Sequence, residues 1–166
     1  MEKDAVDDIL DQWSEERPEL NTAALGVVIR VMTLNRTFAR EAARALEPLG
    51  LELFEYDVLS ALRRHGEPFA LAATGLARET DLSTGAMTNR IDRLEERGLV
   101  EREADKSDRR SVIVRLTRSG RQAIDDAIQV RLDAARAGLA DLKKGERKQL
   151  ADLLRTVVLG ADDSQD

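Results

Sequence analysis

The residues best suited to recognise another molecule lie within residues 82–120 of this 166-residue chain. Small hydroxyl and amide side chains come first, at Thr84, Thr88 and Asn89. Such groups hydrogen-bond the base edges and phosphates of nucleic acids. Residues 105–110 follow as an entirely polar, cation-rich segment. These residue types in this order favour contact with a double-stranded polyanion, DNA.

An amphipathic helix over residues 83–97 must position the first group. At about 100° per residue, Met87, Ile91 and Leu94 fall on one line and face a core. Ser83 is a favourable N-cap, and Gly98 occupies the position at which helices commonly stop.

The outer face of this helix is divided along its length. Its first half is small or amide in character, whereas acidic residues occupy the second half and would be repelled by phosphates. The helix is therefore predicted to enter the major groove by its N-terminal turns. Gly85 permits a close backbone approach, and Arg93 is predicted to reach a phosphate. The predicted DNA contacts from this helix are Ser83, Thr84, Gly85, Thr88, Asn89 and Arg93.

A β-hairpin beside the helix is predicted from two alternating segments, residues 99–104 and 111–117. Its tip supplies further DNA-binding cations from Lys106, Arg109 and Arg110. Asp108 is spaced so that its carboxylate can hold Arg110, and such an arginine can enter the minor groove. Taken alone, this charged tip is more typical of a solvated turn with surface ion pairs, and it is the neighbouring capped helix with a polar outer face that favours DNA binding.

The charge balance fits DNA binding only when it is counted by region. The whole chain carries 26 Lys and Arg against 32 Asp and Glu, a net charge of −6. Residues 83–118 nevertheless hold nine basic and seven acidic residues, so this segment is positive. The local field governs phosphate contact more than the total charge does.

The composition disfavours several other classes of protein. The chain has no cysteine and one histidine, His65, which argues against a transition-metal site. No Ser-His-Asp or Cys-His pair and no Gly-rich phosphate loop occurs, so an enzyme is not expected. The sequence holds no run of eighteen apolar residues and no recognisable signal peptide, so no membrane partner and a cytoplasmic location are expected.

The remaining periodicity is helical. It predicts helices over residues 4–16, 22–46, 53–64 and 72–80, a short strand over 69–71, and two helices after Gly120. The predicted fold is mainly α with a small β-hairpin. It forms a single domain, residues 1–166, in which a winged helix-turn-helix (51–118) is flanked by dimerisation helices (1–48 and 119–160). The helix over 22–46 carries two apolar stripes, and this surplus apolar surface predicts a homodimer.

Residues 82–120 resemble the winged helix-turn-helix of the multiple-antibiotic-resistance regulator (MarR) family. The resemblance rests on D-R-L-E-x-x-G-L-V-x-R after the helix, D-x-R at the hairpin tip and L-T-x-x-G beyond it. It covers roughly residues 53–128. It implies a two-fold homodimer that binds a pseudo-palindromic operator as a transcriptional regulator.

Two further stretches, DILDQWSEERPELN and EYDVLSALRRHGEPFAL, look like the urate-responsive, PecS-like branch of that family. The ligand pocket of this branch uses a tryptophan, an aspartate and two arginines, which match Trp13, Asp57, Arg90 and Arg102. The resemblance implies a repressor that is released by urate or a related anionic purine, with no other cofactor.

The residues themselves are compatible with such a pocket. Asp57 and Arg90 have no opposite charge three or four residues away, so each needs a partner from elsewhere in the fold. Arg102 alternates with Val100 and Ala104 and so points to the apolar side of its strand. Three alternatives remain: an interior ion pair with Trp13 as packing, a pocket for another aromatic anion such as a phenolic acid, or a protein-interaction module without DNA binding.

Overall fold

A computed structural model describes residues 2–105 and 111–162 of the chain. The fold is the predicted one, a mainly helical winged helix-turn-helix with a small antiparallel sheet and helices at both ends. In chain order the elements are α1 (Ala5–Glu16), α2 (Ala23–Leu46), the 3₁₀ turn η1 (Glu47–Leu49), α3 (Leu53–Arg64), β1 (Ala70–Ala72), α4 (Ala73–Glu79), α5 (Thr84–Glu96), β2 (Val100–Ala104), β3 (Val112–Leu116), α6 (Arg118–Ala137) and α7 (Lys144–Asp162).

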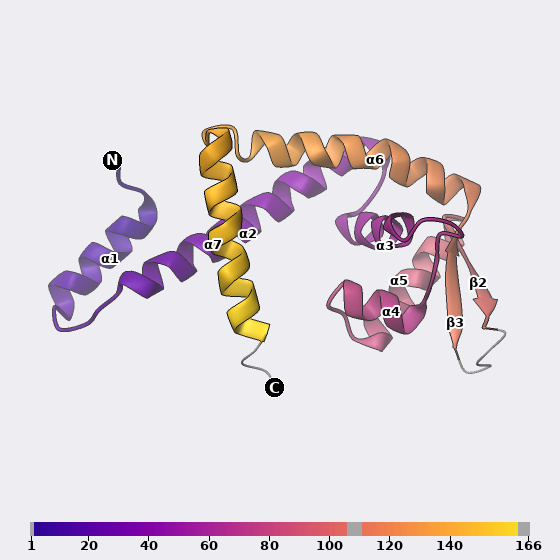
Figure 1. The fold of residues 1–166 in the computed structure, drawn as a ribbon, viewed down its shortest axis with the longest axis horizontal. Coiled ribbons are helices and arrows are strands. Elements are labelled where there is room, and N and C mark those ends of the chain that lie inside the picture. The colour runs from indigo at the N-terminus through magenta and orange to yellow at the C-terminus, as the bar shows by residue number, and fades with distance from the viewer. Residues whose placement is uncertain (1, 106–110, 163–166) are drawn as a thin grey trace.

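The molecule is elongated because its two longest helices extend away from the helix-turn-helix (Figure 1). The C-terminal part of α2 packs against α6, whereas its N-terminal part carries α1 to the far end of the molecule. Arg30 of α2 holds α1 through Asp4 at 2.8 Å and Asp7 at 2.7 Å. A Cβ atom on Gly26 would lie 2.7 Å from the Leu10 side chain, so glycine is what allows α1 to dock this closely.

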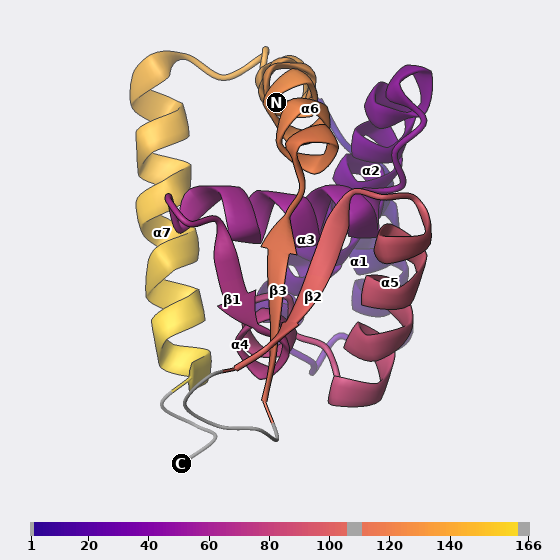
Figure 2. The same cartoon turned by 90° about the vertical axis from the view of Figure 1, so that its right-hand side faces the viewer.

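The sheet forms the wing beside the helix-turn-helix. Its strand order is β1-β3-β2, antiparallel throughout, and Arg102 of β2 lies opposite Val114 of β3 (Figure 2). The strand predicted at residues 69–71 occurs one residue later, at Ala70–Ala72, and pairs with β3. The predicted hairpin is therefore extended by a third strand that ties it to α3 and α4.

The core lies where α3, α5, the sheet and the first half of α6 meet. Apolar side chains from all four line it, together with the end of α2 and with α4, and the largest that are fully buried are Leu46, Val58, Leu59, Leu62, Leu76, Met87, Ile91, Leu94, Val100, Val114 and Ile124. This core holds α5 against α3, so the exposed face of α5 has a fixed direction.

Local capping fixes the bounds of the helices. Ser83 caps α5 by accepting from the Ala86 amide at 3.3 Å, and Gly98 ends it with φ +67°. The helix predicted to open at Gly120 begins two residues earlier, at Arg118. The reason is that the Thr117 hydroxyl accepts from the Gly120 amide at 3.0 Å and so caps the helix from outside its first turn.

Within the described residues, no helix combines the length and hydropathy that a membrane span requires.

Candidate DNA-reading and ligand-binding site

The outer face of the first half of α5 is open to solvent. Thr84, Gly85, Thr88 and Asn89 are all exposed, whereas Met87 beneath them is buried. The Thr88 hydroxyl donates to the Thr84 carbonyl at 3.0 Å, which leaves its lone pairs facing outward. This small, polar surface at the N-terminal end of a rigid helix has the shape and chemistry of a recognition helix.

Gly85 has no steric role within the chain. A Cβ atom there meets nothing within 4 Å, and glycine costs up to about 1 kcal/mol relative to alanine inside a helix. A residue that weakens its helix without an internal reason is consistent with the predicted close backbone approach to DNA.

We expect Gly85→Ala to weaken operator binding about tenfold while slightly raising the stability of the free protein, because the new methyl group occupies the DNA-facing surface. Fluorescence anisotropy with an operator duplex and thermal unfolding measure the two effects. Gly145→Ala, at an equally open position on α7, is the control. Operator affinity unchanged in Gly85→Ala would place this face of α5 away from the DNA.

Arg93 is held by the protein in the absence of DNA. Its guanidinium lies 4.8 Å from the centre of the Phe54 ring and forms an ion pair with Glu52 at 2.6 Å. The side chain is more than half exposed, so the ion pair is a weak one. The predicted phosphate contact of Arg93 therefore requires exchange of one exposed anion, Glu52, for another.

The structure describes the strands of the wing but not the predicted DNA contacts at its tip. Lys106, Asp108, Arg109 and Arg110, the predicted contacts and support at the hairpin tip, lie outside the described residues. Of the two strands that lead to this tip, β2 is the one that packs against α5 (Figure 2).

Arg102 lies on the predicted side of β2, the side of buried Val100, and its partners are carboxylates of α5. It forms ion pairs with Glu95 at 2.5 Å and with Asp92, and donates to the Thr88 carbonyl at 3.4 Å. Burial disfavours the charge of Arg102, but the hydrogen bonds to Asp92 and Glu95 outweigh it and hold its pKa above the usual value. In this state Arg102 clamps the wing to α5.

Arg90 lies on the opposite flank of α5, about 140–160° around the helix from the residues that Arg102 contacts. It stacks on Phe54 of α3, with its Cζ atom 5.0 Å from the ring centre. Among the described residues it has no carboxylate within ion-pair distance. The single chain therefore does not bring Arg90 and Arg102 into one pocket.

Asp57 lies on an exposed flank of α3 in an unusual electrostatic setting. Desolvation by the surrounding protein raises its pKa, while the positive charges of Arg131, Arg90 and Arg64 oppose that rise. Asp57 and Arg90 thus lie close enough for the charge of one to act on the other, and so do two arginines that the sequence reasoning missed, Arg131 and Arg64. A visible signal for Arg131 was its position four residues after Ala127, on the buried stripe of α6.

We expect Asp57→Asn to stabilise the free protein at neutral pH. Because the pKa of Asp57 is raised on folding, the folded state binds more protons than the unfolded state above the ordinary carboxyl pKa of 3.8, and stability falls as pH rises. Asparagine does not titrate, so the variant does not lose stability in this way as pH rises. Its gain in stability over wild type is therefore largest at neutral pH and disappears as pH falls toward 3.8. Thermal unfolding across this pH range measures the difference; a variant less stable than wild type at pH 7 would contradict it.

Trp13 lies on α1, far from the other predicted ligand residues (Figure 1). Its side chain is 42% exposed. The predicted pocket, wedged between α1, the recognition helix and the hairpin, is not formed within one chain. The physical reason is α2, whose 24 residues span about 36 Å and carry α1 away from α5.

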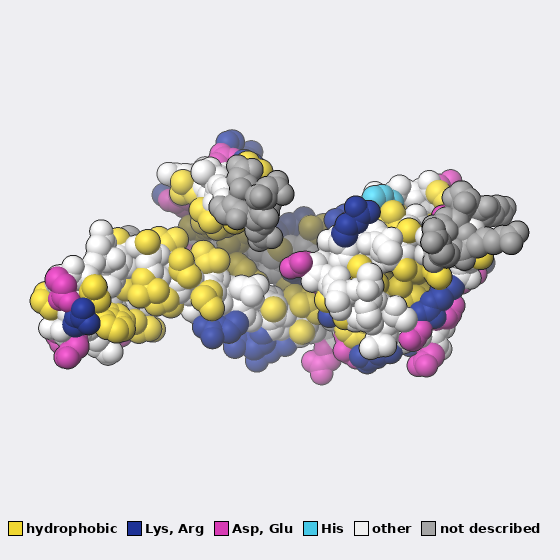
Figure 3. Space-filling model, turned by 90° about the horizontal axis from the view of Figure 1, so that it is seen from below, with side chains coloured by type: hydrophobic (Ala, Val, Ile, Leu, Met, Phe, Trp, Pro, Cys, Tyr) yellow, Lys and Arg dark blue, Asp and Glu magenta, His cyan; other side chains and the backbone are white. Residues whose placement is uncertain are grey.

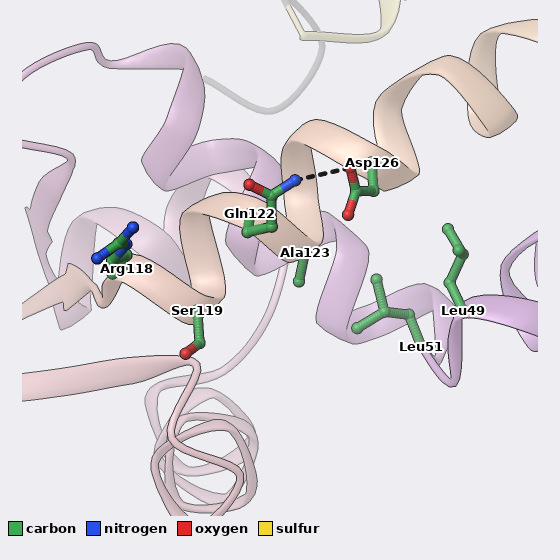
Figure 4. A pocket seen from close by; sticks show the side chains of 7 residues that line it. All are labelled: Leu49, Leu51, Arg118, Ser119, Gln122, Ala123 and Asp126. Atoms are coloured by element: carbon green, nitrogen blue, oxygen red, sulfur yellow. Dashed lines mark hydrogen bonds between the residues drawn. The ribbon is translucent and has the colours of Figure 1, made fainter.

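A cleft of about 580 Å³ lies between η1 and the start of α6. Figure 4 shows Arg118 at one end, well away from Leu49 and Leu51 at the other. The amide of Gln122 donates to Asp126 at 2.9 Å, so the polar groups between these ends bind each other. This cleft lies apart from Asp57 and Arg90 and offers no converging charges.

A helix-turn-helix with an exposed recognition helix and a three-stranded wing defines the class of winged helix-turn-helix DNA-binding proteins. Within that class the chain belongs to the MarR family of transcriptional regulators, a family of DNA-binding proteins and not of enzymes. The model of the MarR family matches residues 49–111 of this chain.

Individual relatives extend the match beyond the helix-turn-helix. The chain is 30% identical to the transcriptional regulator PecS of Dickeya dadantii over 152 residues, 92% of each protein. It is 32% identical to the transcriptional repressor NicR of Pseudomonas putida, over 75% of this chain and 79% of NicR. Among solved structures, a variant of MarR from E. coli complexed with operator DNA superposes with a TM-score of 0.72 at 27% identity, covering 87% of this chain and 96% of that one.

Proposed function

We propose that the protein is a homodimeric repressor that binds a pseudo-palindromic operator and is released by urate or a related anionic purine. The observation that carries the ligand response is the position of Arg90. It lies on the recognition helix, beside Asp57, and no carboxylate of the described residues neutralises it at short range. A ligand that attracts Arg90 acts directly on the element that reads DNA.

The homodimer is supported by apolar surface that one chain leaves uncovered. Both predicted stripes of α2 are exposed in its N-terminal half, and α7 has scarcely any buried surface. Figure 3 shows hydrophobic side chains gathered over α1 and the adjoining part of α2. The large exposed side chains are Leu25, Val27, Val28, Val31, Met32, Leu34, Leu153, Leu154, Val157, Val158 and Leu159. Contiguous apolar surface of this extent is typical of an interface, and a two-fold dimer covers it with a copy of itself.

We assign residues 1–48 and 119–160 to this dimer and residues 51–118 to DNA. A two-fold dimer presents two recognition helices to half-sites about one helical turn, roughly 34 Å, apart. The similarity to a MarR variant that was solved in complex with operator DNA supports operator binding by this chain. Operator affinity that falls steeply with salt concentration is expected, whereas a protein-interaction module would show no such binding.

The ligand pocket is proposed to form between subunits. Asp57 and Arg90 provide its charged centre and Trp13 covers the purine ring, whereas Arg102 keeps its ion pairs on the opposite flank of α5. Since α1 lies far from α5 in one chain, Trp13 is supplied by the partner subunit. Asp57 either accepts from ring N–H groups or repels the anion. The similarity to PecS, which extends over 92% of this chain, supports this arrangement.

Arg102 ties the wing to the recognition helix in the proposed switch. In the free chain it is paired with Asp92 and Glu95 and clamps β2 to α5. Because this clamp ties the wing to α5, a ligand that attracts Arg90 moves the wing together with the recognition helix. The wing and the recognition helix then shift relative to the dimer, and the half-site spacing no longer fits the operator. By linkage, operator DNA must weaken urate binding by the same factor.

Ligand titration of the intact protein tests the effector class. We expect urate to raise the thermal unfolding temperature in a concentration-dependent manner, because a ligand that binds the folded state stabilises it. If salicylate, a phenolic acid, stabilises the protein and urate does not, the effector is the alternative aromatic anion and not a purine. No stabilisation by either would overturn the proposed ligand response while leaving DNA binding intact.

A further inference from the structure

Arg131 is a cation on a face of α6 that otherwise meets the core. It follows Gly120, Ile124 and Ala127, all buried, at helical spacing. The side chain is partly buried, yet it forms no hydrogen bond or ion pair with any described residue. Other arginines of this lobe are paired, including Arg63 with Asp125 and Arg97 with Glu55. A partly buried guanidinium without a carboxylate is a position at which an anion is favoured.

The packing of α3 on α6 directs Arg131 toward Asp57. Arg63 of α3 bonds Asp125 of α6 at 2.7 Å. Six residues back along α3 is Asp57, and six residues onward along α6 is Arg131. Both residues therefore lie on helices that pack against each other, away from the Arg63–Asp125 pair. The positive charge of Arg131 is accordingly felt at Asp57, together with that of Arg90.

Arg131 also borders an apolar cavity. A volume of about 150 Å³ between α2 and α6 is lined by apolar side chains and by two charged ones. Its lining consists of Phe38, Glu41, Ala42, Arg131, Ala134, Ala135 and Leu139. Arg131 therefore stands between an apolar wall and Asp57. A flat aromatic ring with a negatively charged edge matches these neighbours, with the ring on the apolar side and the charge on the arginines.

We propose that Arg131 is a further ligand-binding residue, and that Arg90 and Arg131 hold the anionic edge of an aromatic ligand from opposite sides of Asp57. This inference rests on the proposed ligand response. Arg90 belongs to the recognition helix, whereas Arg131 belongs to the helix that leads into the proposed dimer interface. A ligand bound by both ties the DNA-reading lobe to the dimerisation helices in one orientation.

Isothermal titration of urate into the full-length dimer tests this role. We expect Arg131→Gln to raise the Kd for urate about 10- to 100-fold, because a charge-assisted hydrogen bond is lost. Arg136→Gln is the matched control. Arg136 lies on the same helix, is well exposed and pairs only with Asp133 among the described residues, so its replacement should leave the Kd within about twofold.

Two outcomes separate the inference from the function on which it rests. If wild-type protein binds neither urate nor salicylate, the proposed ligand response fails and the role of Arg131 fails with it. If wild type binds urate and Arg131→Gln binds it equally well, the role of Arg131 alone is overturned. If Arg131→Gln does not fold, Arg131→Lys tests the role of Arg131. Lysine keeps the positive charge but lacks the planar guanidinium, which can donate two parallel hydrogen bonds. We expect that variant to bind about 3- to 10-fold more weakly, and an unchanged Kd would contradict the proposal.

Discussion

Gly120→Ala is expected to destabilise the protein by more than about 3 kcal/mol and to prevent folding at physiological temperature. Gly120 lies in the first turn of α6, where a Cβ atom would stand 1.8 Å from the carbonyl oxygen of Leu99. That oxygen belongs to the backbone and also accepts from the Thr117 amide at 3.2 Å, so it cannot move aside without breaking the junction. Strand β2, strand β3 and α6 all meet at this point.

The control for this prediction is Gly145→Ala, in the first turn of α7, where an added Cβ meets nothing within 4 Å. Its stability should change by less than about 1 kcal/mol, in the stabilising direction. Urea unfolding followed by circular dichroism compares the two variants with wild type. Equal unfolding midpoints for Gly120→Ala and wild type would mean that the contact between α6 and Leu99 is not tight.

Glu55→Ala is expected to cost about 2–3 kcal/mol, the second-largest effect on stability. Glu55 is 1% exposed and binds two groups at once. It accepts from the Glu52 amide at 2.9 Å and from the guanidinium of Arg97, which also donates to the Gly50 carbonyl at 2.9 Å. Removing the carboxylate leaves a buried void and an unpaired arginine, and it detaches the C-terminal end of the recognition helix from α3.

Glu52→Ala is the matched control for Glu55→Ala. Glu52 also pairs with an arginine of α5, Arg93, at 2.6 Å, but both side chains are 57% exposed. An exposed ion pair contributes about 0–1 kcal/mol, so the control should unfold close to wild type. Equal losses in the two variants, measured by urea unfolding, would contradict the view that burial gives Glu55 its importance.

The sequence predicted those parts of the fold that depend on neighbours along the chain. Ser83 and Gly98 marked the limits of α5 because caps act within a few residues, and the residues of α3 were predicted as the structure has them. The side of β2 on which Arg102 lies followed from strand alternation. The start of α6 was placed at Gly120 because glycine was taken as a helix opener, whereas its role is to admit the Leu99 carbonyl.

The candidate site was harder to predict from the sequence, because the residues that pair with its side chains come from distant elements. Nothing local reveals that Asp92 and Glu95 turn toward Arg102, since this depends on how β2 packs along α5. The separation of Trp13 from Asp57 follows from the length and direction of α2. Arg131 was passed over since its charge interrupts an apolar stripe, although that interruption is what distinguishes it.

The most direct test of the account is the ratio of operator affinities with and without urate. The operator is a duplex selected from a random pool by the protein itself, and its Kd is measured by fluorescence anisotropy at fixed salt. For wild type we predict that saturating urate raises this Kd at least about tenfold, a coupling of about 1.4 kcal/mol. For Arg90→Ala the ratio should fall to about one. A wild-type operator Kd that urate leaves unchanged, or full urate sensitivity in Arg90→Ala, would contradict the central claim that Arg90 couples the ligand to DNA.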